Sequence, residues 1–344
     1  MTGTEPTVGT PVEAAPATVD AGAATSRLEA IARDALRAYR IGPAAELALL
    51  NISENATYRV DDPATGERTV LRVHRPGYHS RAAIDSELAW VQALRHDGAV
   101  RTPAVVPAAD GSQVVAGRAG GESRNAVMFA WVQGTEPPQD RLVEDFEELG
   151  AITARLHRHA RSWARPAGFT RLTWDYQQSI GPSGHWGRWQ DGIGVGTAEL
   201  NQLSSLDNRL RQRLAAFGTG PDRFGLIHAD MRLANLLVDD GTVSVIDFDD
   251  CGFGWYMYDL GSSVSFIEHY PTVPEMIDSW VSGYRSEEPL SAADAAELPT
   301  FVLLRRLLLV AWVGSHSDTE LATSLGAEFT RVSCDLAEDY LSKH

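Results

Sequence analysis

The chain has 344 residues, a formal net charge of −16 and 44% hydrophobic residues, which is ordinary for a soluble globular protein. Its length allows one large or two modest domains with a hydrophobic core. The acidic balance argues against a protein that binds nucleic acid through a basic face, and it suits a cationic small substrate. The longest apolar run, residues 307–313, is too short to span a bilayer, so we expect no membrane partner.

The N-terminal residues indicate neither a secretory signal nor a folded element. The first 26 residues lack both the basic start and the apolar stretch of a secretory signal. Residues 1–25 are rich in Ala, Thr, Pro and Gly, and we expect a disordered tail. The two cysteines, Cys251 and Cys334, do not make a disulfide framework. These observations favour a cytoplasmic protein.

The next hundred residues predict a small strand-rich unit with one packed helix. Helical apolar spacing covers 27–40 and 80–95, whereas short runs rich in β-branched residues predict strands. The expected strands are 56–60, 69–74, 111–117 and 125–132. Residues 133–138, "QGTEPP", are rich in turn-forming residues and predict a linker.

Beyond this linker the pattern is mostly helical. We expect helices over 142–160, 197–217, 275–284 and 300–316, and a strand over 242–248. Residues 161–195 are rich in Gly and contain four tryptophans: Trp163, Trp174, Trp186 and Trp189. These tryptophans are either core residues or part of a site that binds a cation through cation–π contacts. The sequence does not decide between the two.

One short stretch concentrates the polar groups that phosphoryl transfer requires. Residues 226–238, "LIHADMRLANLLV", place Asp230 and Asn235 five residues apart between apolar segments. Asp247 follows in "IDFDD", at the end of the next apolar run. Phosphoryl transfer needs a base beside the attacking hydroxyl and oxygen ligands for Mg²⁺. An Asp, an Asn and a second Asp supply that set.

This H-x-D-x-x-x-x-N pattern, followed by I-D-F-D, resembles the catalytic core of the aminoglycoside phosphotransferase and choline kinase family. The resemblance extends to Asp259 in "YDLG" and to "NISENATYRV", "VLRVHR" and "SELAW" near the N-terminus, and it covers about residues 45–315. Among the members of this family, the sequence most resembles the homoserine-kinase-like and stress-response-kinase-like bacterial ones. It implies an α+β, protein-kinase-like bilobal fold, with an antiparallel-sheet N-lobe (26–133) that binds nucleotide. A larger, mostly helical C-lobe (134–344) would bind the acceptor.

The resemblance also implies a role for individual residues. Asp230 would orient the acceptor hydroxyl and take its proton, while Asn235 and Asp247 would bind Mg²⁺. His228 and Asp259 would be structural, and Asp249 is a weaker candidate for contact with metal or substrate. The residues expected to bind the nucleotide are Ser53, Asn55, Arg72, Glu87, Phe129, Trp131 and Val132.

Arg72 departs from the family pattern. The third strand normally carries a lysine that pairs with a helix glutamate, here Glu87. In this chain the only lysine is Lys343, and the other 29 of the 30 basic residues are arginines. Arginine stays charged at all working pH values and can bind Glu87 and phosphate oxygens bidentately. We therefore expect catalysis to survive this replacement.

The sequence thus predicts a Mg²⁺-dependent O-phosphotransferase that uses ATP or GTP. The acceptor would be an amino alcohol, a hydroxy amino acid, or an aminoglycoside or nucleoside antibiotic, and the sequence does not choose between them. One alternative is an atypical protein Ser/Thr kinase, although residues 248–258 leave little room for an activation segment. The other is a catalytically degenerate nucleotide-binding scaffold, suggested by Arg72. The oligomeric state stays open.

Overall fold

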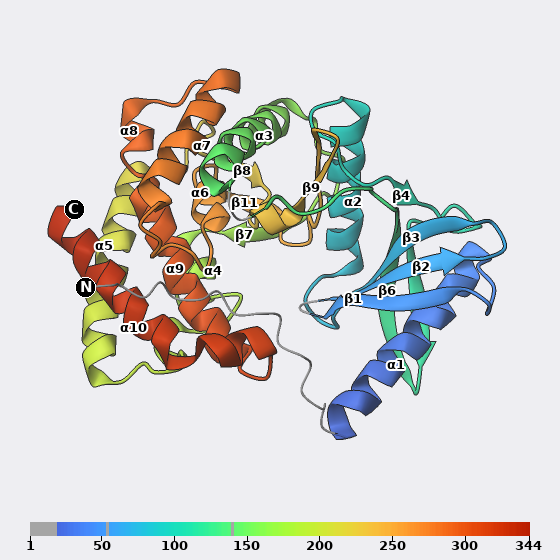
Figure 1. Ribbon diagram of the computed structural model, residues 1–344. Helices are drawn as coiled ribbons and strands as arrows, with labels where there is room; N and C mark the ends of the chain where they lie inside the picture. Colours follow the sequence, from blue (N-terminus) through green and yellow to red (C-terminus); the bar gives the residue numbers. More distant parts are fainter. Residues whose placement is uncertain (1–18, 53–54, 139–140) are drawn as a thin grey trace, which may run out of the picture. The chain divides into compact units, whose positions relative to one another are not determined.

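The computed structural model describes residues 19–52, 55–138 and 141–344 (Figure 1). These residues form two compact units. Unit 1 contains the described residues up to Pro76 together with Pro107–Met128, and unit 2 contains Gly77–Val106 and Phe129–His344. The sheet of unit 1 and the helices of unit 2 confirm the predicted α+β class. The predicted lobe boundary at residue 133 stays a prediction.

Unit 1 is an antiparallel sheet with a helix packed on it. Strands β1 (Glu46–Ile52), β2 (Ala56–Asp62), β3 (Glu67–Val73) and β6 (Glu122–Ala130) follow in spatial order, and β5 (Val114–Ala119) pairs with β6. The side chains of Ala56, Tyr58 and Val60 alternate into the core, which explains why this stretch forms a strand.

Helix α1 (Val19–Leu36), which is continued by η1 (Arg37–Tyr39), packs against β5 and β3 (Figure 1). It begins at Val19 rather than near Arg27, so the segment expected to be a tail is helical over 19–25. Residues 1–18 lie outside the described part.

Helix α2 (Arg81–His96) belongs to unit 2. The hydroxyl of Ser80 caps its N-terminus by accepting a hydrogen bond from the Ala83 amide at 3.1 Å. The buried Trp90 ring meets the Phe248 ring edge to face, with centroids 5.5 Å apart. Strand β4 (Val105–Val106) follows α2, and Ala104 accepts a hydrogen bond from the Ala130 amide at 2.8 Å.

The rest of unit 2 is a helical assembly. Its helices are α3 (Leu142–Ser162), α4 (Tyr176–Ser179), α5 (Thr197–Phe217), α6 (Tyr258–Ser263), α7 (Val273–Glu287), α8 (Ala292–Ala295), α9 (Leu298–Ser315) and α10 (Glu320–Lys343), with 3₁₀ turns η3 (Trp189–Asp191) and η4 (Leu233–Asn235). Helices α3 and α7 cross at Gly150 and Gly283. A Cβ on Gly150 would lie 2.1 Å from the Trp280 oxygen, and one on Gly283 would lie 1.8 Å from the Glu147 oxygen. Only glycine permits this close approach.

Helix α9 forms the core of unit 2. Residues Ala292–Ser315 are long and apolar enough to cross a membrane by length and composition, which the shorter run at 307–313 did not suggest. However, 78% of this apolar window is buried within the structure. Two arginines, Arg305 and Arg306, are buried in the same helix. Burial in the core therefore explains the apolar composition of this helix.

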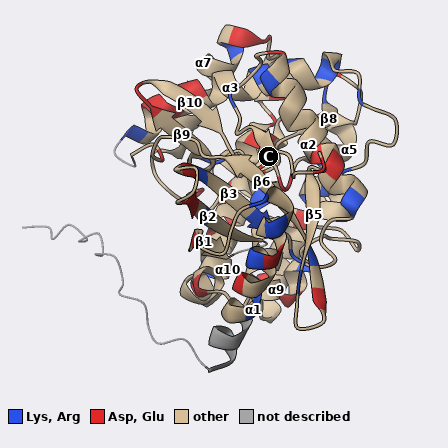
Figure 2. Ribbon diagram, turned by 90° about the vertical axis from the view of Figure 1, so that its right-hand side faces the viewer, with Lys and Arg blue, Asp and Glu red and all other residues tan. Residues whose placement is uncertain are grey.

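Two small sheets frame the catalytic motif. Strand β11 (Gly252–Trp255) pairs with β7 (Leu172–Trp174) in parallel and with β8 (Phe224–Ile227) in antiparallel orientation. Strands β9 (Leu236–Asp239) and β10 (Thr242–Val245) form a hairpin. The predicted strand over 242–248 therefore ends at Val245, before the motif carboxylate. In Figure 2, acidic and basic residues are interspersed along the helices and strands.

Candidate active site

The predicted catalytic stretch is an irregular loop from His228 to Asn235, which leaves β8 and enters β9. Ala229 has a φ of 68° and Asp247 a φ of 61°. This left-handed region is uncommon for residues with a Cβ, and it persists only where the surroundings impose it. The strain therefore marks the two places where the chain turns to present the motif carboxylates.

Helix α6 supplies that restraint. The Asp259 carboxylate accepts hydrogen bonds from the amides of His228 (3.2 Å) and Ala229 (2.7 Å). The Ser262 hydroxyl accepts from the Met231 amide at 2.9 Å, and the Ser263 hydroxyl donates to the Met231 oxygen at 2.7 Å. Asp259 is fully buried, in agreement with the structural role expected of it.

Two buried histidines complete this support. His157 Nε2 lies 2.9 Å from the Asp259 carboxylate, and burial lowers the pKa of His157, so its neutral ring donates this hydrogen bond. His228 Nε2 donates to the Ile246 oxygen at 3.2 Å, while its Nδ1 accepts from the Asp230 amide at 3.3 Å. Burial also lowers the pKa of His228. Both ring nitrogens of His228 are thus engaged with the backbone, which fits a structural role.

The Asp230 carboxylate lies within a network of three donors. Arg305 Nη2 donates to Oδ1 at 2.7 Å, and Asn235 Nδ2 donates to Oδ2 at 2.9 Å. Arg232 Nε lies 3.2 Å from Oδ1 and 3.3 Å from Oδ2. Burial opposes ionisation, but the charges of Arg232 and Arg305 outweigh it and lower the pKa of Asp230. The ionised carboxylate can accept a hydrogen bond from an acceptor hydroxyl.

Arg305 was not among the residues predicted from the sequence. It lies on α9, far along the chain, with only 3% of its surface exposed. Its Nε donates to the Ser265 hydroxyl at 2.9 Å, and its Nη1 lies 3.2 Å from the Tyr258 hydroxyl and 3.3 Å from the Ala229 oxygen. Two adjacent arginines in an apolar helix are the signal that could have identified it, because buried charges need partners.

Asn235 and Asp247 carry the oxygen atoms that Mg²⁺ prefers. Asn235 Nδ2 donates to the Asp230 backbone oxygen (2.8 Å) and to its carboxylate (2.9 Å), so both amide hydrogens are used and Oδ1 remains for a cation. The Ile246 amide donates to the Asn235 backbone oxygen at 2.9 Å, which ties the residue before Asp247 to this loop. Asp247 is exposed. One carboxylate and one amide oxygen fit a Mg²⁺ ion that keeps phosphate and water ligands.

No group of three or more His, Cys, Asp or Glu side chains that could hold a metal ion occurs among the described residues. A metal site here would therefore depend on the nucleotide phosphates for further ligands, as is usual for Mg²⁺ in phosphotransferases.

Asp250 is a second carboxylate near Asp230. The Tyr78 hydroxyl donates to Asp250 Oδ1 at 2.6 Å, and Trp174 Nε1 donates to the Asp250 backbone oxygen at 2.8 Å. Burial, followed by the negative charges of Asp230 and Asp249, raises the pKa of Asp250 to about 8. A cation bound here would favour the ionised carboxylate. From the sequence alone, Asp250 would be predicted to be a solvated carboxylate.

The segment carrying Asp250 is fixed to α2. The buried guanidinium of Arg171 donates to the backbone oxygens of Ala83 (3.0 Å) and Cys251 (2.6 Å), and also to that of Asp249. His79 Nε2 lies 3.6 Å from the Asp249 carboxylate, which is itself buried. Asp249 therefore faces a histidine.

Aromatic rings from the Trp-rich segment lie beside these carboxylates. Trp174, Trp186 and Trp189 are buried, so three of the four tryptophans are core residues, the first of the two roles expected of them. The Trp186 ring lies 5.4 Å from that of Trp174 and 5.1 Å from the Arg305 guanidinium. Within the described residues, Trp186 Nε1 is buried and has no hydrogen-bond partner.

The residues expected to bind the nucleotide occur in both units. Ser53 lies outside the described residues, and Asn55 Oδ1 accepts a hydrogen bond from the Arg75 amide at 3.1 Å in unit 1. Arg72 is buried on β3 of unit 1, and Glu87 is buried on α2 of unit 2. Phe129, Trp131 and Val132 are half-buried at the end of β6. Their nucleotide contacts and the Arg72–Glu87 pair stay predictions.

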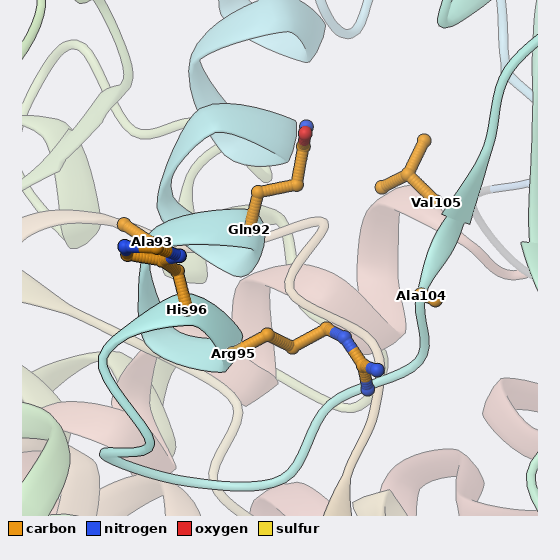
Figure 3. Close-up of a pocket in the computed structure, with 6 residues that line it drawn as sticks. All are labelled: Gln92, Ala93, Arg95, His96, Ala104 and Val105. Carbon is orange, nitrogen blue, oxygen red and sulfur yellow. The ribbon is translucent and has the colours of Figure 1, made fainter.

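A surface hollow of about 600 Å³ lies elsewhere in unit 2. Figure 3 shows its lining, which comes from the last turns of α2 and the residues before and in β4: Gln92, Ala93, Arg95, His96, Ala104 and Val105. It contains none of the motif residues, so it is not assigned to phosphoryl transfer.

Comparison with known proteins identifies the family. Residues 47–294 match the model of the phosphotransferase enzyme family. The chain belongs to this family. A solved microcompartment-associated aminopropanol kinase is 51% identical, with a TM-score of 0.85, and the alignment covers 91% of this chain and 97% of that one. The amicoumacin kinase of Bacillus subtilis is 30% identical over 175 residues, which are 48% of this chain and 49% of that protein.

A second solved structure, the amicoumacin kinase hAmiN in complex with AMP-PNP and Ca²⁺, is 22% identical. Its TM-score is 0.76, and the alignment covers 92% of this chain and 96% of that one, which shows a shared fold. The predicted membership and the kinase-like fold are therefore confirmed, and the protein is a small-molecule kinase.

Proposed function

We propose that this phosphotransferase moves the γ-phosphoryl group of ATP to the hydroxyl of a small amino alcohol, with Mg²⁺ bound. The 51% identity with an aminopropanol kinase, over 97% of that chain, carries the proposal. The site supports it independently, because Asp250 offers a carboxylate for an ammonium group near the carboxylate that would meet the hydroxyl. One cluster connects the two residues, because Trp174 donates to the Asp250 backbone oxygen and packs against Trp186, whose ring lies 5.1 Å from the Arg305 guanidinium that holds Asp230.

Each group has a defined role in this reaction. Asp230 accepts a hydrogen bond from the acceptor hydroxyl, aligns its oxygen for in-line attack and takes its proton as the new bond to the γ-phosphorus forms. The bond between that phosphorus and the β,γ-bridging oxygen breaks at the same time, and ADP leaves. Asn235 Oδ1 and the Asp247 carboxylate would hold the metal ion, whose charge offsets that of the phosphates. Asp250, with Tyr78 on one oxygen, would bind the ammonium group.

The charge of the site discriminates between the acceptor classes. An acceptor ammonium group would favour the ionised form of Asp250, whereas an acceptor that carries its own carboxylate, such as a hydroxy amino acid, would meet repulsion at that carboxylate. An amino alcohol carries only the positive charge. The intact network of Asp230, Asn235 and Arg305 also disfavours a degenerate scaffold, because it maintains an ionised carboxylate without another evident purpose.

The test is a panel of acceptors measured by nucleotide consumption, with ATP and GTP in parallel and Mg²⁺ present. The panel pairs 1-amino-2-propanol with 1,2-propanediol, which lacks the ammonium group, and with homoserine, which adds a carboxylate. We expect the amino alcohol to have the largest kcat/KM and ATP to be the donor. A larger kcat/KM for homoserine or for the diol would contradict the ammonium subsite.

A further inference from the structure

Arg305 is the only residue of α9 that reaches the carboxylate of the catalytic motif through a hydrogen bond among the described residues. Its guanidinium connects three parts of the chain. It bonds Asp230 and the Ala229 oxygen in the loop, the Tyr258 hydroxyl on α6, and the Ser265 hydroxyl just after α6. Arginine presents five donors in a rigid fork, so these contacts fix the orientation of the guanidinium.

A different residue donates to each of the two carboxylate oxygens of Asp230. Arg305 holds Oδ1 and Asn235 holds Oδ2, so the carboxylate plane is fixed at both ends. A carboxylate can accept about four hydrogen bonds, so these two bonds leave positions for an acceptor hydroxyl. Arg232 is 32% exposed and its contacts with both oxygens are longer, so it is the partner that an incoming hydroxyl can displace.

The neighbouring Arg306 shows what a purely structural arginine looks like in this helix. It is 1% exposed, and it donates to Glu268 (2.7 Å), to the Ser333 hydroxyl (2.7 Å) and to the Phe329 oxygen (2.9 Å). These partners lie after α6 and on α10, outside the motif. Arg305 has the same burial and a similar number of bonds, but its carboxylate partner is the motif aspartate.

We propose that Arg305 is a positioning residue for phosphoryl transfer, which holds the Asp230 carboxylate in the orientation that receives the acceptor hydroxyl. The inference rests on the proposed role of Asp230, but it does not depend on which acceptor is used. A purely structural Arg305 would only affect folding. A positioning role predicts, in addition, a loss of turnover in variants that fold and still bind nucleotide.

The test compares Arg305→Met, Arg305→Lys and the matched control Arg306→Met. Circular dichroism and ATP affinity, measured by calorimetry with Mg²⁺, establish that each variant is folded. We expect Arg305→Met to lower kcat by about 100-fold, as misplacement of a reacting group does, with the ATP affinity within about twofold of wild type. Arg305→Lys should recover part of kcat, because lysine restores the charge but not the fork.

Arg306→Met should lower the melting temperature while keeping kcat within about threefold of wild type, since it leaves the Asp230 carboxylate in place. The proposal is overturned if Arg305→Met keeps kcat within about threefold, or if Arg306→Met loses as much kcat as Arg305→Met. If Arg305→Met does not fold, the lysine variant decides, because full kcat in that variant would contradict the need for the fork.

Failure of the amino-alcohol assignment would be seen in the wild-type enzyme, as absence of turnover with that acceptor. In that case the same variants are compared by their Mg²⁺-dependent ATP hydrolysis, in which water replaces the acceptor beside Asp230. An unchanged hydrolysis rate in both Arg305 variants would overturn the positioning role by itself.

Discussion

Asp250→Asn should make the free protein more stable while impairing it as an enzyme. The pKa of Asp250 is raised from 3.8 to about 8, first by burial and then by Asp230 and Asp249. Each pKa unit corresponds to about 1.4 kcal/mol, so the raised pKa of this carboxyl lowers the free energy of unfolding by roughly 4 kcal/mol at pH 7. Asparagine carries no charge and can still accept the Tyr78 hydrogen bond, but its amide also loses hydrogen bonds to water on folding, which offsets part of the gain. We therefore expect a net gain of about 2 to 4 kcal/mol.

The pH dependence gives this prediction its sign. A carboxyl group with a raised folded-state pKa contributes most to stability below its unfolded pKa, and that contribution is lost as the pH rises through the folded pKa. The advantage of Asp250→Asn should therefore be small near pH 4, grow by about 1.4 kcal/mol per pH unit and level off above about pH 8. Urea unfolding of both proteins from pH 4.5 to 9, without nucleotide or Mg²⁺, measures it. If the difference in the free energy of unfolding does not change with pH, or if the variant is less stable at pH 8, the pKa of Asp250 is not raised in the folded protein.

The same substitution should weaken binding of a cationic acceptor, because it removes the carboxylate proposed to bind the ammonium group. We expect the KM for 1-amino-2-propanol to rise at least about tenfold, as loss of a charged hydrogen bond costs about 1.5 to 3 kcal/mol. The KM for ATP should change little. A rise confined to ATP would move Asp250 out of the acceptor site.

Three further substitutions test the remaining assignments. Asp230→Asn should lower kcat by about 100-fold or more while nucleotide affinity stays near wild type, and equal activity would remove Asp230 from the reaction. Asp247→Asn keeps a residue that tolerates the observed φ of 61° but removes the charge, so calorimetric titration should show weaker Mg²⁺-dependent nucleotide binding; an unchanged titration would contradict the ligand role. Arg72→Lys should raise the KM for ATP several-fold, since lysine cannot bind phosphate bidentately, and an unchanged KM would show that the fork is not used.

Much of this fold follows from local patterns. The apolar periods of 142–160 and 197–217 correspond to α3 and α5, and the hairpin over 56–74 corresponds to β2 and β3. These elements obey short-range rules that a single sequence displays. The beginning of α1 was missed because residues 19–26 carry almost no apolar period. The end of the strand before Asp247 was missed because its turn depends on contacts with the loop after β8.

The motif residues could be identified from spacing, but their supporting residues could not. Asp230 and Asn235 lie five positions apart, so local sequence places them together, and the structure shows their side chains hydrogen-bonded. Arg305 and Tyr78 approach the motif from distant segments, on α9 and just before α2, through tertiary packing alone. Asp250 could not be singled out, because its raised pKa arises from burial and from nearby carboxylates, which the sequence cannot show.

The identity of the product is the sharpest test of the proposed reaction. Wild-type enzyme, ATP, Mg²⁺ and 1-amino-2-propanol would be followed by ³¹P nuclear magnetic resonance, with Asp230→Asn as the blank. We predict a phosphate ester on the hydroxyl oxygen, formed together with ADP and absent from the blank. A phosphorus–nitrogen product, or ADP formation without any phosphorylated amino alcohol, would contradict this reaction.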